Sequence, residues 1–395
     1  MIPQEHIWTG ELNRRALGDA ASAPEKVGLY DTTLRDGEQT VGVALDPEQK
    51  LAIARAIDSL GIERIEAGFP RVSKDDTEAF RAIAAAGLDA EIWGFARAVP
   101  ADVDALLEIG VHAAVIESPV SDGKLKAYGI SREDLIRRVT TAVAHASESG
   151  VTVCFFGVDG TRADLEFLKR VYTEAVQAGA KEIAIVDTLG AVTPEAAALL
   201  VRSAREWVGG KIPVHWHGHN DFGLATAAAV AAAQAGARWV QGTINGMGER
   251  AGNANLGEVA LALEALYGIP TNLRFERLRE VADLVQRTSG YELEPWKPLT
   301  GSTLFTRESG AVASQFHDPP AIEPYSSQLV GAPRRIVLGK KSGLDSIRIK
   351  LDELGLETPE DRWPALLAEV KALGARKHGL VSDDEFRGLV NANAE

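Results

Sequence analysis

The chain has 395 residues, of which 45% are hydrophobic and 25% charged, the composition of a globular protein with a substantial core. Its net charge of −14 argues against nucleic acid as the main partner, because phosphate backbones select basic surfaces. The single cysteine, Cys154, excludes a disulfide framework and a cysteine-based zinc site, and we predict that it is a small buried side chain. No stretch is long and apolar enough to span a membrane and no secretory signal is recognised, so we expect a cytoplasmic protein.

Short apolar runs alternate with amphipathic segments from residue 27 onward. We predict eight buried strands, at residues 27–30, 64–67, 91–95, 113–117, 151–156, 182–186, 212–216 and 239–243. Helix-start signals lie between them, such as Asp46-Pro47-Glu48 and Thr193-Pro194-Glu195, and a long alanine-rich helix is expected from Phe222. Eight alternations favour an α/β fold, a (βα)8 TIM barrel over residues 27–268. An open doubly wound sheet is the alternative, which the lack of a Gly-x-Gly-x-x-Gly motif after the first strand disfavours.

Two further regions flank the predicted barrel. Residues 1–26 are interpreted as an N-terminal extension, and residues 269–395 as a smaller, mainly helical C-terminal region. Helices are predicted in that region at residues 275–287, 359–373 and 383–391, and residues 301–333 form a long segment rich in Ser, Pro and Gly.

Polar residues gather at the C-terminal ends of the predicted strands, where barrel enzymes carry their active sites. His217 and His219 lie two residues apart in an extended segment, so both imidazoles can face one metal ion. His215 has the same parity, and the spacing leaves open which two of the three bind. A carboxylate from residues 31–39 could complete the site, and Arg35 could hold a substrate carboxylate or stabilise an oxyanion.

Several separate motifs together resemble the metal-dependent acyl-CoA condensing enzymes, the family of isopropylmalate synthase, homocitrate synthase and, more remotely, hydroxymethylglutaryl-CoA lyase. They lie at residues 31–39, 66–70, 187–190, 217–221 and 245–253. The resemblance implies a divalent metal cation (Zn, Mn, Mg or Co) held by Asp36, His217 and His219, with Asn253 close to it. It also implies that Arg35 and Thr188 bind the 2-oxo acid, and Glu38 is a further substrate-binding candidate. Members of the family commonly pair as dimers, so a homodimer is expected. From the length of the chain, no feedback domain like that of isopropylmalate synthases is expected.

The reaction implied by this resemblance is a Claisen-type condensation of acetyl-CoA with a 2-oxo acid. A carbon–carbon lyase working on the same metal site is the alternative, although the chain has no cysteine after Cys154, whereas hydroxymethylglutaryl-CoA lyases place one in a late glycine-rich loop. A third possibility is a regulatory protein that has lost turnover, which the intact set of Arg35 and the three metal ligands argues against.

Three positions depart from the family pattern. Val158 replaces a catalytic glutamate after the fifth strand, Val312 replaces a histidine of the C-terminal region, and a substrate-side histidine is replaced near Ser121. The family's usual acid–base groups are therefore missing. Tyr325 is favoured as a replacement, and His317 is a second candidate because histidine suits proton transfer near neutrality. The other candidates are Glu308, Glu323, Asp159 and Glu117.

Two arginines bear on the identity of the acceptor. Arg71, after the second strand, and Arg97, at the end of the third, could meet an anionic group at the far end of the 2-oxo acid. The product would then be an alkylmalate- or homocitrate-like acid, including a phosphono- or phosphinomethylmalate-like one. The alternative for Arg71 is a surface ion pair with Asp75 or Asp76. Lys340-Lys341 could bind CoA phosphates or be solvated.

Overall fold

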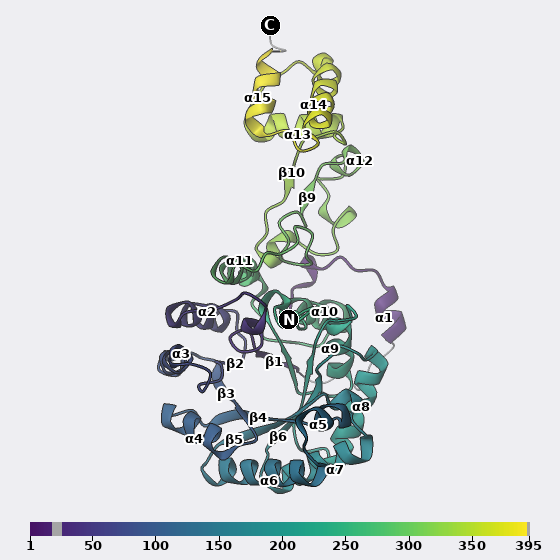
Figure 1. Ribbon diagram of the computed structural model, residues 1–395. Helices are drawn as coiled ribbons and strands as arrows, with labels where there is room; N and C mark the ends of the chain where they lie inside the picture. Colours follow the sequence, from purple (N-terminus) through teal and green to yellow (C-terminus); the bar gives the residue numbers. More distant parts are fainter. Residues whose placement is uncertain (18–25, 393–395) are drawn as a thin grey trace. The chain divides into compact units, whose positions relative to one another are not determined.

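The computed structural model describes residues 1–17 and 26–392 (Figure 1). It divides into two compact units, one made of Met1 with Glu11–Leu293 and the other of Ile2–Gly10 with Glu294–Glu395. The last part of the predicted N-terminal extension, residues 18–25, lies outside the described residues. None of the described helices combines the length and apolar character needed to cross a membrane.

The first unit is a closed parallel barrel whose strands follow one another in chain order, so the predicted (βα)8 fold is confirmed. Each strand pairs in parallel with the next, and β8 closes onto β1 with Leu29 opposite Val240. The strands are β1 (Gly28–Asp31), β2 (Arg64–Glu66), β3 (Glu91–Arg97), β4 (Ala113–Pro119), β5 (Thr152–Val158), β6 (Glu182–Asp187), β7 (Val214–Gly218) and β8 (Trp239–Gly242).

The seventh strand begins two residues later than predicted, at Val214. Pro213 has no amide hydrogen to give to the sheet, so the strand starts after it and includes His217. This shift matters for function, because it puts His217 inside the rigid strand and His219 directly beyond its end.

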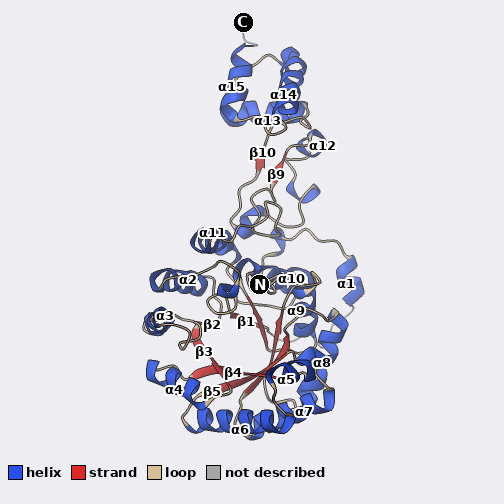
Figure 2. Ribbon diagram, in the orientation of Figure 1, coloured by secondary structure: helices blue, strands red, loops and turns tan. Residues whose placement is uncertain are grey.

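Helices surround the strands of the first unit, as Figure 2 shows in blue around red. Asp46 and Gln49 form a reciprocal capping box at the start of α2 (Pro47–Ser59), as the Asp-Pro-Glu signal predicts. The remaining helices between the strands are α3 (Lys74–Ala84), α4 (Pro100–Ile109), α5 (Asp122–Tyr128), α6 (Arg132–Glu148), α7 (Leu165–Gln177), α8 (Pro194–Trp207), α9 (Ala225–Gln234) and α10 (Leu256–Tyr267).

The alanine-rich helix α9 begins at Ala225, so its predicted start near Phe222 is wrong. The backbone N–H of Gly223 donates to the carbonyl of Asn220, which closes a turn over residues 220–223. The side-chain oxygen of Asn220 then accepts from the N–H of Ala225. Polar turn chemistry therefore delays the helix by three residues.

Inward-facing side chains fill the barrel with a mixed aromatic and aliphatic core. The buried members are Tyr30, Trp93, Ala113, Val115, Cys154, Phe156, Ala184 and Val186, with Phe95 and Val158 packed against them. The predicted burial of Cys154 is confirmed. After α10, the 3-10 turn η5 (Phe275–Arg277) and α11 (Leu278–Ser289) complete the unit by packing on α2 and on η4 (Ile244–Gly246).

Short elements make up most of the second unit before its helices. They are η1 (Gln4–His6), the parallel pair β9 (Thr306–Arg307) and β10 (Arg335–Ile336), α12 (Gly310–Ala313), η6 (Pro319–Ala321) and η7 (Ser327–Val330). The helices α13 (Leu344–Leu354), α14 (Trp363–Lys377) and α15 (Asp383–Ala392) share an apolar core around Ile347, Leu351 and Phe386. Helix α13 was not predicted, although its apolar residues recur at helical spacing.

Candidate metal centre and active site

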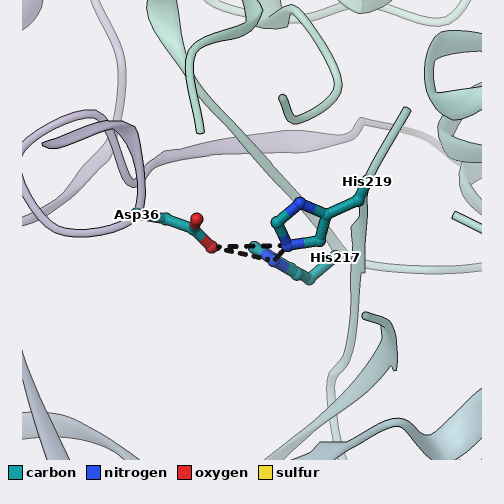
Figure 3. Close-up of side chains that lie close together, drawn as sticks. All are labelled: Asp36, His217 and His219. Atoms are coloured by element: carbon teal, nitrogen blue, oxygen red, sulfur yellow. Dashed lines mark hydrogen bonds and ion pairs between the residues drawn. The ribbon is translucent and has the colours of Figure 1, made fainter. Parts of the chain in front are cut away.

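Three buried side chains converge at the C-terminal end of the barrel. Asp36 lies in the loop after β1, His217 in β7 and His219 just beyond it (Figure 3). The Oδ2 atom of Asp36 is 3.2 Å from Nε2 of His217 and 3.7 Å from Nε2 of His219, and the two Nε2 atoms are 3.4 Å apart. Ligand atoms bound at about 2.1 Å to one divalent cation are separated by about this much. The three side chains are therefore placed so that they could hold one divalent cation together.

His215 is held away from this centre by partners at the other end of the barrel. Its Nε2 atom is 2.5 Å from Oε2 of Glu182, and its Nδ1 atom is 3.1 Å from the side-chain nitrogen of Gln241. Both ring nitrogens are thus engaged. Of the three histidines, His217 and His219 are therefore the two that lie with Asp36, whereas His215 lies with Glu182 and Cys154.

The local geometry of the loop after β1 places Asp36, and not Asp31, beside the two histidines. Asp31 turns back on its own loop, where its carboxylate accepts from the N–H of Thr33 at 2.8 Å and from the hydroxyl of Thr33 at 2.9 Å. The carbonyl of Thr32 accepts from the N–H of Asp36 at 2.8 Å in a tight turn. This turn carries the Asp36 side chain to the histidines.

The charges and the unused atoms of the site fit a bound cation. Burial alone would raise the pKa of Asp36, but Arg35 and His217 outweigh it and hold that pKa well below its usual range. Burial and the neighbouring His217 lower the pKa of His219 to about 4, so its imidazole is neutral, the form that binds metals. Oδ1 of Asp36 and Oδ1 of Asn253 are buried without a hydrogen-bond partner, which is costly unless another group engages them.

Arg35 lies beside the metal centre with one nitrogen unused. Its Nε pairs with Glu66, which also accepts from the hydroxyl of Tyr30 at 2.9 Å, and its Nη1 donates to Asp36 at 3.0 Å. The guanidinium lies over the ring of Phe95, 4.4 Å from its centroid. The buried Nη2 atom has no partner and can donate to a substrate oxygen. Glu66 is a positioning residue whose role the sequence motif did not specify.

The glycine-rich loop after β8 brings Asn253 to the site. Asn253 forms an antiparallel bridge with His219, and its amide nitrogen donates to the carbonyl of Met247 at 3.0 Å, which leaves its oxygen free. The bridge requires glycine at position 252, where φ is +82° and a Cβ atom would lie 1.9 Å from the carbonyl oxygen of Gly246.

Thr188, after β6, is tied into the loops around the metal centre. Its hydroxyl oxygen accepts from the backbone N–H of Asp159 at 2.7 Å, so the hydroxyl hydrogen remains available to a ligand. Its carbonyl accepts from Arg250 at 2.6 Å, and Arg250 also binds both carboxylate oxygens of Asp221. Arg250 thus connects three of the sequence motifs, a role that the motifs alone did not indicate.

The departures from the family pattern have visible structural consequences. Val158 packs on the apolar core instead of offering a carboxylate. The hydroxyl of Ser121 donates to Asp159 at 2.5 Å, and Asp159 also accepts two bonds from Arg162. Asp159 is therefore a fully engaged structural carboxylate.

Arg71 and Arg97 meet on one buried carboxylate, that of Asp102 in α4. Arg97 donates to both its oxygens, at 2.7 and 3.1 Å, while Nε of Arg71 lies 3.4 Å away. Both arginine side chains stay about half exposed: that of Arg97 is 53% exposed and that of Arg71 is 46% exposed. The ion pair of Arg71 with Asp75 or Asp76 that was weighed as an alternative is not formed in the described residues, and Asp76 instead binds Lys50.

A cavity of about 390 Å³ opens beside Arg35 and Phe95. Glu38 lines it, but the carboxylate of Glu38 already accepts from the N–H of Leu45 at 2.9 Å and pairs with Lys50 at 2.5 Å. These contacts hold the loop after β1, and substrate binding by Glu38 stays a prediction. The other walls are Leu34, Gln39, Val43, Ala44, Leu45, Lys50, Phe69, Val72, Ser73, Asp75 and Asp76.

The remaining candidates belong to the second unit. The ring of Tyr325 packs edge-to-face on Phe305, and His317 is exposed. Their assignment to acid–base catalysis stays a prediction. Glu323 is bonded by Arg334 at 2.9 and 3.1 Å, and Glu308 accepts from the backbone N–H of Lys341 at 3.0 Å. Lys341 is also the ion-pair partner of Glu308.

A closed parallel barrel with two histidines and one carboxylate at its C-terminal face defines a metal-dependent enzyme of the (βα)8 class. Comparison with known families assigns it further. Residues 26–285 match the HMGL-like family, and residues 299–378 match the family described as homocitrate synthase post-HMGL domain-like. The chain belongs to the HMGL-like family.

Relatives of known name are similar over almost the whole chain. A homocitrate synthase of Methanopyrus kandleri is 44% identical over 369 residues, which are 93% of this chain and 92% of the relative. A 2-isopropylmalate synthase of Methanocaldococcus jannaschii is 40% identical over 96% of this chain and 74% of its own length. The solved structure of a Bacillus subtilis HMG-CoA lyase covers 69% of this chain and 96% of its own with a TM-score of 0.60 and 22% identity, a likeness of fold alone.

Proposed function

We propose that this enzyme condenses acetyl-CoA with a 2-oxo acid to give a 2-hydroxy acid and CoA. The observation that carries the proposal is the convergence of Asp36, His217 and His219 beside an arginine, Arg35, whose Nη2 atom is unused. Relatives named as homocitrate and isopropylmalate synthases, at 40% identity or more, support the same general reaction.

Different residues of the barrel bind and activate the 2-oxo acid acceptor. A divalent cation held by Asp36, His217 and His219 supplies Lewis acidity for the keto carbonyl of the acceptor. Arg35 donates from Nη2 to the acceptor, and its permanent charge stabilises the oxyanion that develops when the carbonyl is attacked. Thr188 donates its free hydroxyl hydrogen to the acceptor carboxylate, which fixes the acceptor's orientation.

The acceptor is proposed to carry a second anionic group. Arg71 and Arg97 follow β2 and β3, and Asp102 holds both guanidiniums in place while they stay half exposed. Because Arg71 and Arg97 share the single carboxylate of Asp102 and stay half exposed, their guanidiniums keep N–H groups that can bind a carboxylate, phosphonate or phosphinate. A branched alkyl tail would gain nothing from this pair.

Release of free thiol from acetyl-CoA, measured with a panel of 2-oxo acids, tests the reaction. We expect metal-dependent release that is fastest with acceptors bearing a second anionic group. Cleavage of a hydroxyacyl-CoA without any thiol release from acetyl-CoA would favour the lyase and overturn the synthase.

The acceptor preference is tested separately through Arg97. Arg97→Gln should raise KM for doubly anionic acceptors about tenfold or more while leaving KM for singly charged ones unchanged. Arg137→Gln, which removes an exposed arginine on α6, is the matched control. An equal effect on both acceptor classes would contradict the role of Arg97.

A further inference from the structure

Glu117 is a carboxylate on β4 whose position in the barrel directs it inward. Side chains alternate between the two faces of a strand, and Ala113 and Val115 belong to the barrel core, so Glu117 has the inward parity. In the sheet it lies opposite Arg97 of β3 and Phe156 of β5. It therefore stands one layer above the core, at the C-terminal face where the metal centre lies.

The carboxylate of Glu117 is half-buried and has no hydrogen-bond or ion-pair partner among residues 1–17 and 26–392. The other three carboxylates considered for the missing acid–base role are engaged. Asp159 binds Ser121 and Arg162, Glu323 binds Arg334, and Glu308 binds Lys341. A partly buried carboxylate that lacks a partner loses solvation without gaining a compensating contact, so it adds nothing to the stability of the barrel mouth.

The neighbours of Glu117 connect it to the metal centre. The ring of Phe156, opposite it on β5, packs on the imidazole of His217 with the centroids 5.1 Å apart. The guanidinium of Arg35 lies 5.8 Å from the centre of the same ring. Val158, where the family pattern has a glutamate, is the next inward residue of β5. Glu117 thus offers, from the adjacent strand, a carboxylate that β5 lacks.

The electrostatic surroundings suit a proton acceptor. Burial raises the pKa of Glu117, and Asp102 acts in the same direction, whereas Arg35, Lys124 and Arg97 oppose the rise. A carboxylate with a raised pKa is a stronger base than an ordinary one.

We propose that Glu117 is the general base that removes a proton from the methyl group of acetyl-CoA, a role that rests on the proposed condensation. The carboxylate takes the proton, and the C–H electron pair forms the enolate. The enolate carbon then bonds to the keto carbon of the acceptor, and the C=O electron pair moves to oxygen. Glu117 passes its proton to that oxygen, and water cleaves the thioester to a carboxylic acid and the CoA thiol.

Glu117→Gln tests the proposal, with Glu108→Gln on the exposed face of α4 as the matched control. We expect kcat for thiol release to fall about 10²–10⁴-fold, the usual worth of a general base, with KM and metal content within threefold of the parent. The kinetic isotope effect with methyl-deuterated acetyl-CoA should increase, because proton removal becomes the slow step. The control should match the parent in every respect.

The possible results of this experiment distinguish a failure of the Glu117 proposal from a failure of the proposed condensation. A parent enzyme that condenses, together with a Glu117→Gln variant within threefold of it, overturns the role of Glu117 alone. A parent enzyme that releases no thiol with any acceptor overturns the proposed function and this inference with it. Should Glu117→Gln not fold, rescue of Glu117→Ala by added formate supports the base, and absence of rescue in a folded, metal-loaded Glu117→Ala protein contradicts it.

A pH profile gives a second, independent readout. Because the base must be ionised, kcat/KM of the parent should fall as pH drops through the pKa of Glu117, at a higher pH than an ordinary glutamate would require. Glu117→Gln should lack this acidic limb in its residual activity. An unchanged limb would assign it to another group and contradict the proposal.

Discussion

Glu182 at the start of β6 is predicted to stabilise the barrel through a buried ionic network far from the chemistry. Its carboxylate accepts from Arg64 at 2.6 and 3.1 Å and lies 2.5 Å from Nε2 of His215. Arg64 is itself stacked between Trp93 and Trp239, 4.4 and 3.8 Å from their ring centres. Glu182→Gln keeps the shape of the side chain and removes the charge that the network depends on.

The expected loss follows from the pKa of this carboxyl. Burial would raise it, but His215 and Arg64 outweigh burial and lower the pKa of Glu182 from 4.5 to about 2. Since one pKa unit corresponds to 1.36 kcal/mol, this shift limits the contribution of ionised Glu182 to about 3 kcal/mol. Burial lowers the pKa of His215, so its ring is uncharged at pH 7 and Arg64 is the cationic partner of Glu182 there. Breaking a buried ion pair by removing one partner costs a similar amount, about 3–5 kcal/mol. The lowered pKa means that this contribution is present above about pH 4.5 and is lost as pH falls towards 2.

Urea unfolding of the metal-free protein at pH 7, followed by tryptophan fluorescence, measures the effect. Glu182→Gln should lower the free energy of unfolding by about 3 kcal/mol. Glu91→Gln is the matched control, because Glu91 also binds Arg64, at 2.9 Å, but its side chain is 50% exposed, so the loss should be about 1 kcal/mol or less. Equal losses for the two variants, or no weakening of the parent between pH 4.5 and 2, would refute the reasoning.

Two further predictions concern the active site. Gly252→Ala should weaken metal binding about tenfold or more in a titration, because its Cβ atom would meet the carbonyl of Gly246 and displace Asn253. The control is Gly268→Ala, which is also at positive φ but in open space and should leave metal affinity unchanged. Equal affinities in the two variants would contradict this prediction. Arg35→Lys should raise KM for the 2-oxo acid and lower kcat in steady-state assays, because the compact ammonium lacks the planar fork that lets Arg35 contact Glu66 and Asp36 and still present Nη2 to substrate. Unchanged constants would argue against a substrate contact.

Local patterns in the sequence were sufficient to predict the barrel and the convergence of its polar residues. Apolar runs of strand length, capping signals and helix-ending glycines are local features, and their eightfold recurrence sets the topology. The parity of His215, His217 and His219 is also local, so the spacing could predict that their imidazoles face one side, but not which two of them share a site.

What could not be predicted depends on contacts between residues far apart in the chain. The choice between His215 and His219 as a metal ligand depends on Glu182 and Gln241, which only the register of the closed barrel brings to His215. The partnership of Arg97 with Asp102 likewise depends on how α4 packs against β3. Such pairings leave no periodic signal in the sequence.

Only the structure shows that the Glu117 carboxylate has no hydrogen-bond or ion-pair partner among the described residues. In the sequence it was one acidic residue among several candidates, and nothing in its neighbours along the chain distinguished it. The contacts of the other three carboxylates single it out, because each of those is engaged by an arginine or a lysine.

Carbon–carbon bond formation from labelled acetyl-CoA tests the central claim most directly. The metal-loaded enzyme would be incubated with acetyl-CoA carrying ¹³C in its methyl group and a 2-oxo acid with a second anionic group, and the products analysed by NMR. We predict that the label appears in the methylene of a 2-hydroxy acid with three acidic groups, and that an Asp36→Ala variant with reduced metal content forms none of this product. Label that remains in acetyl-CoA or in acetate, with every acceptor offered, would contradict the account.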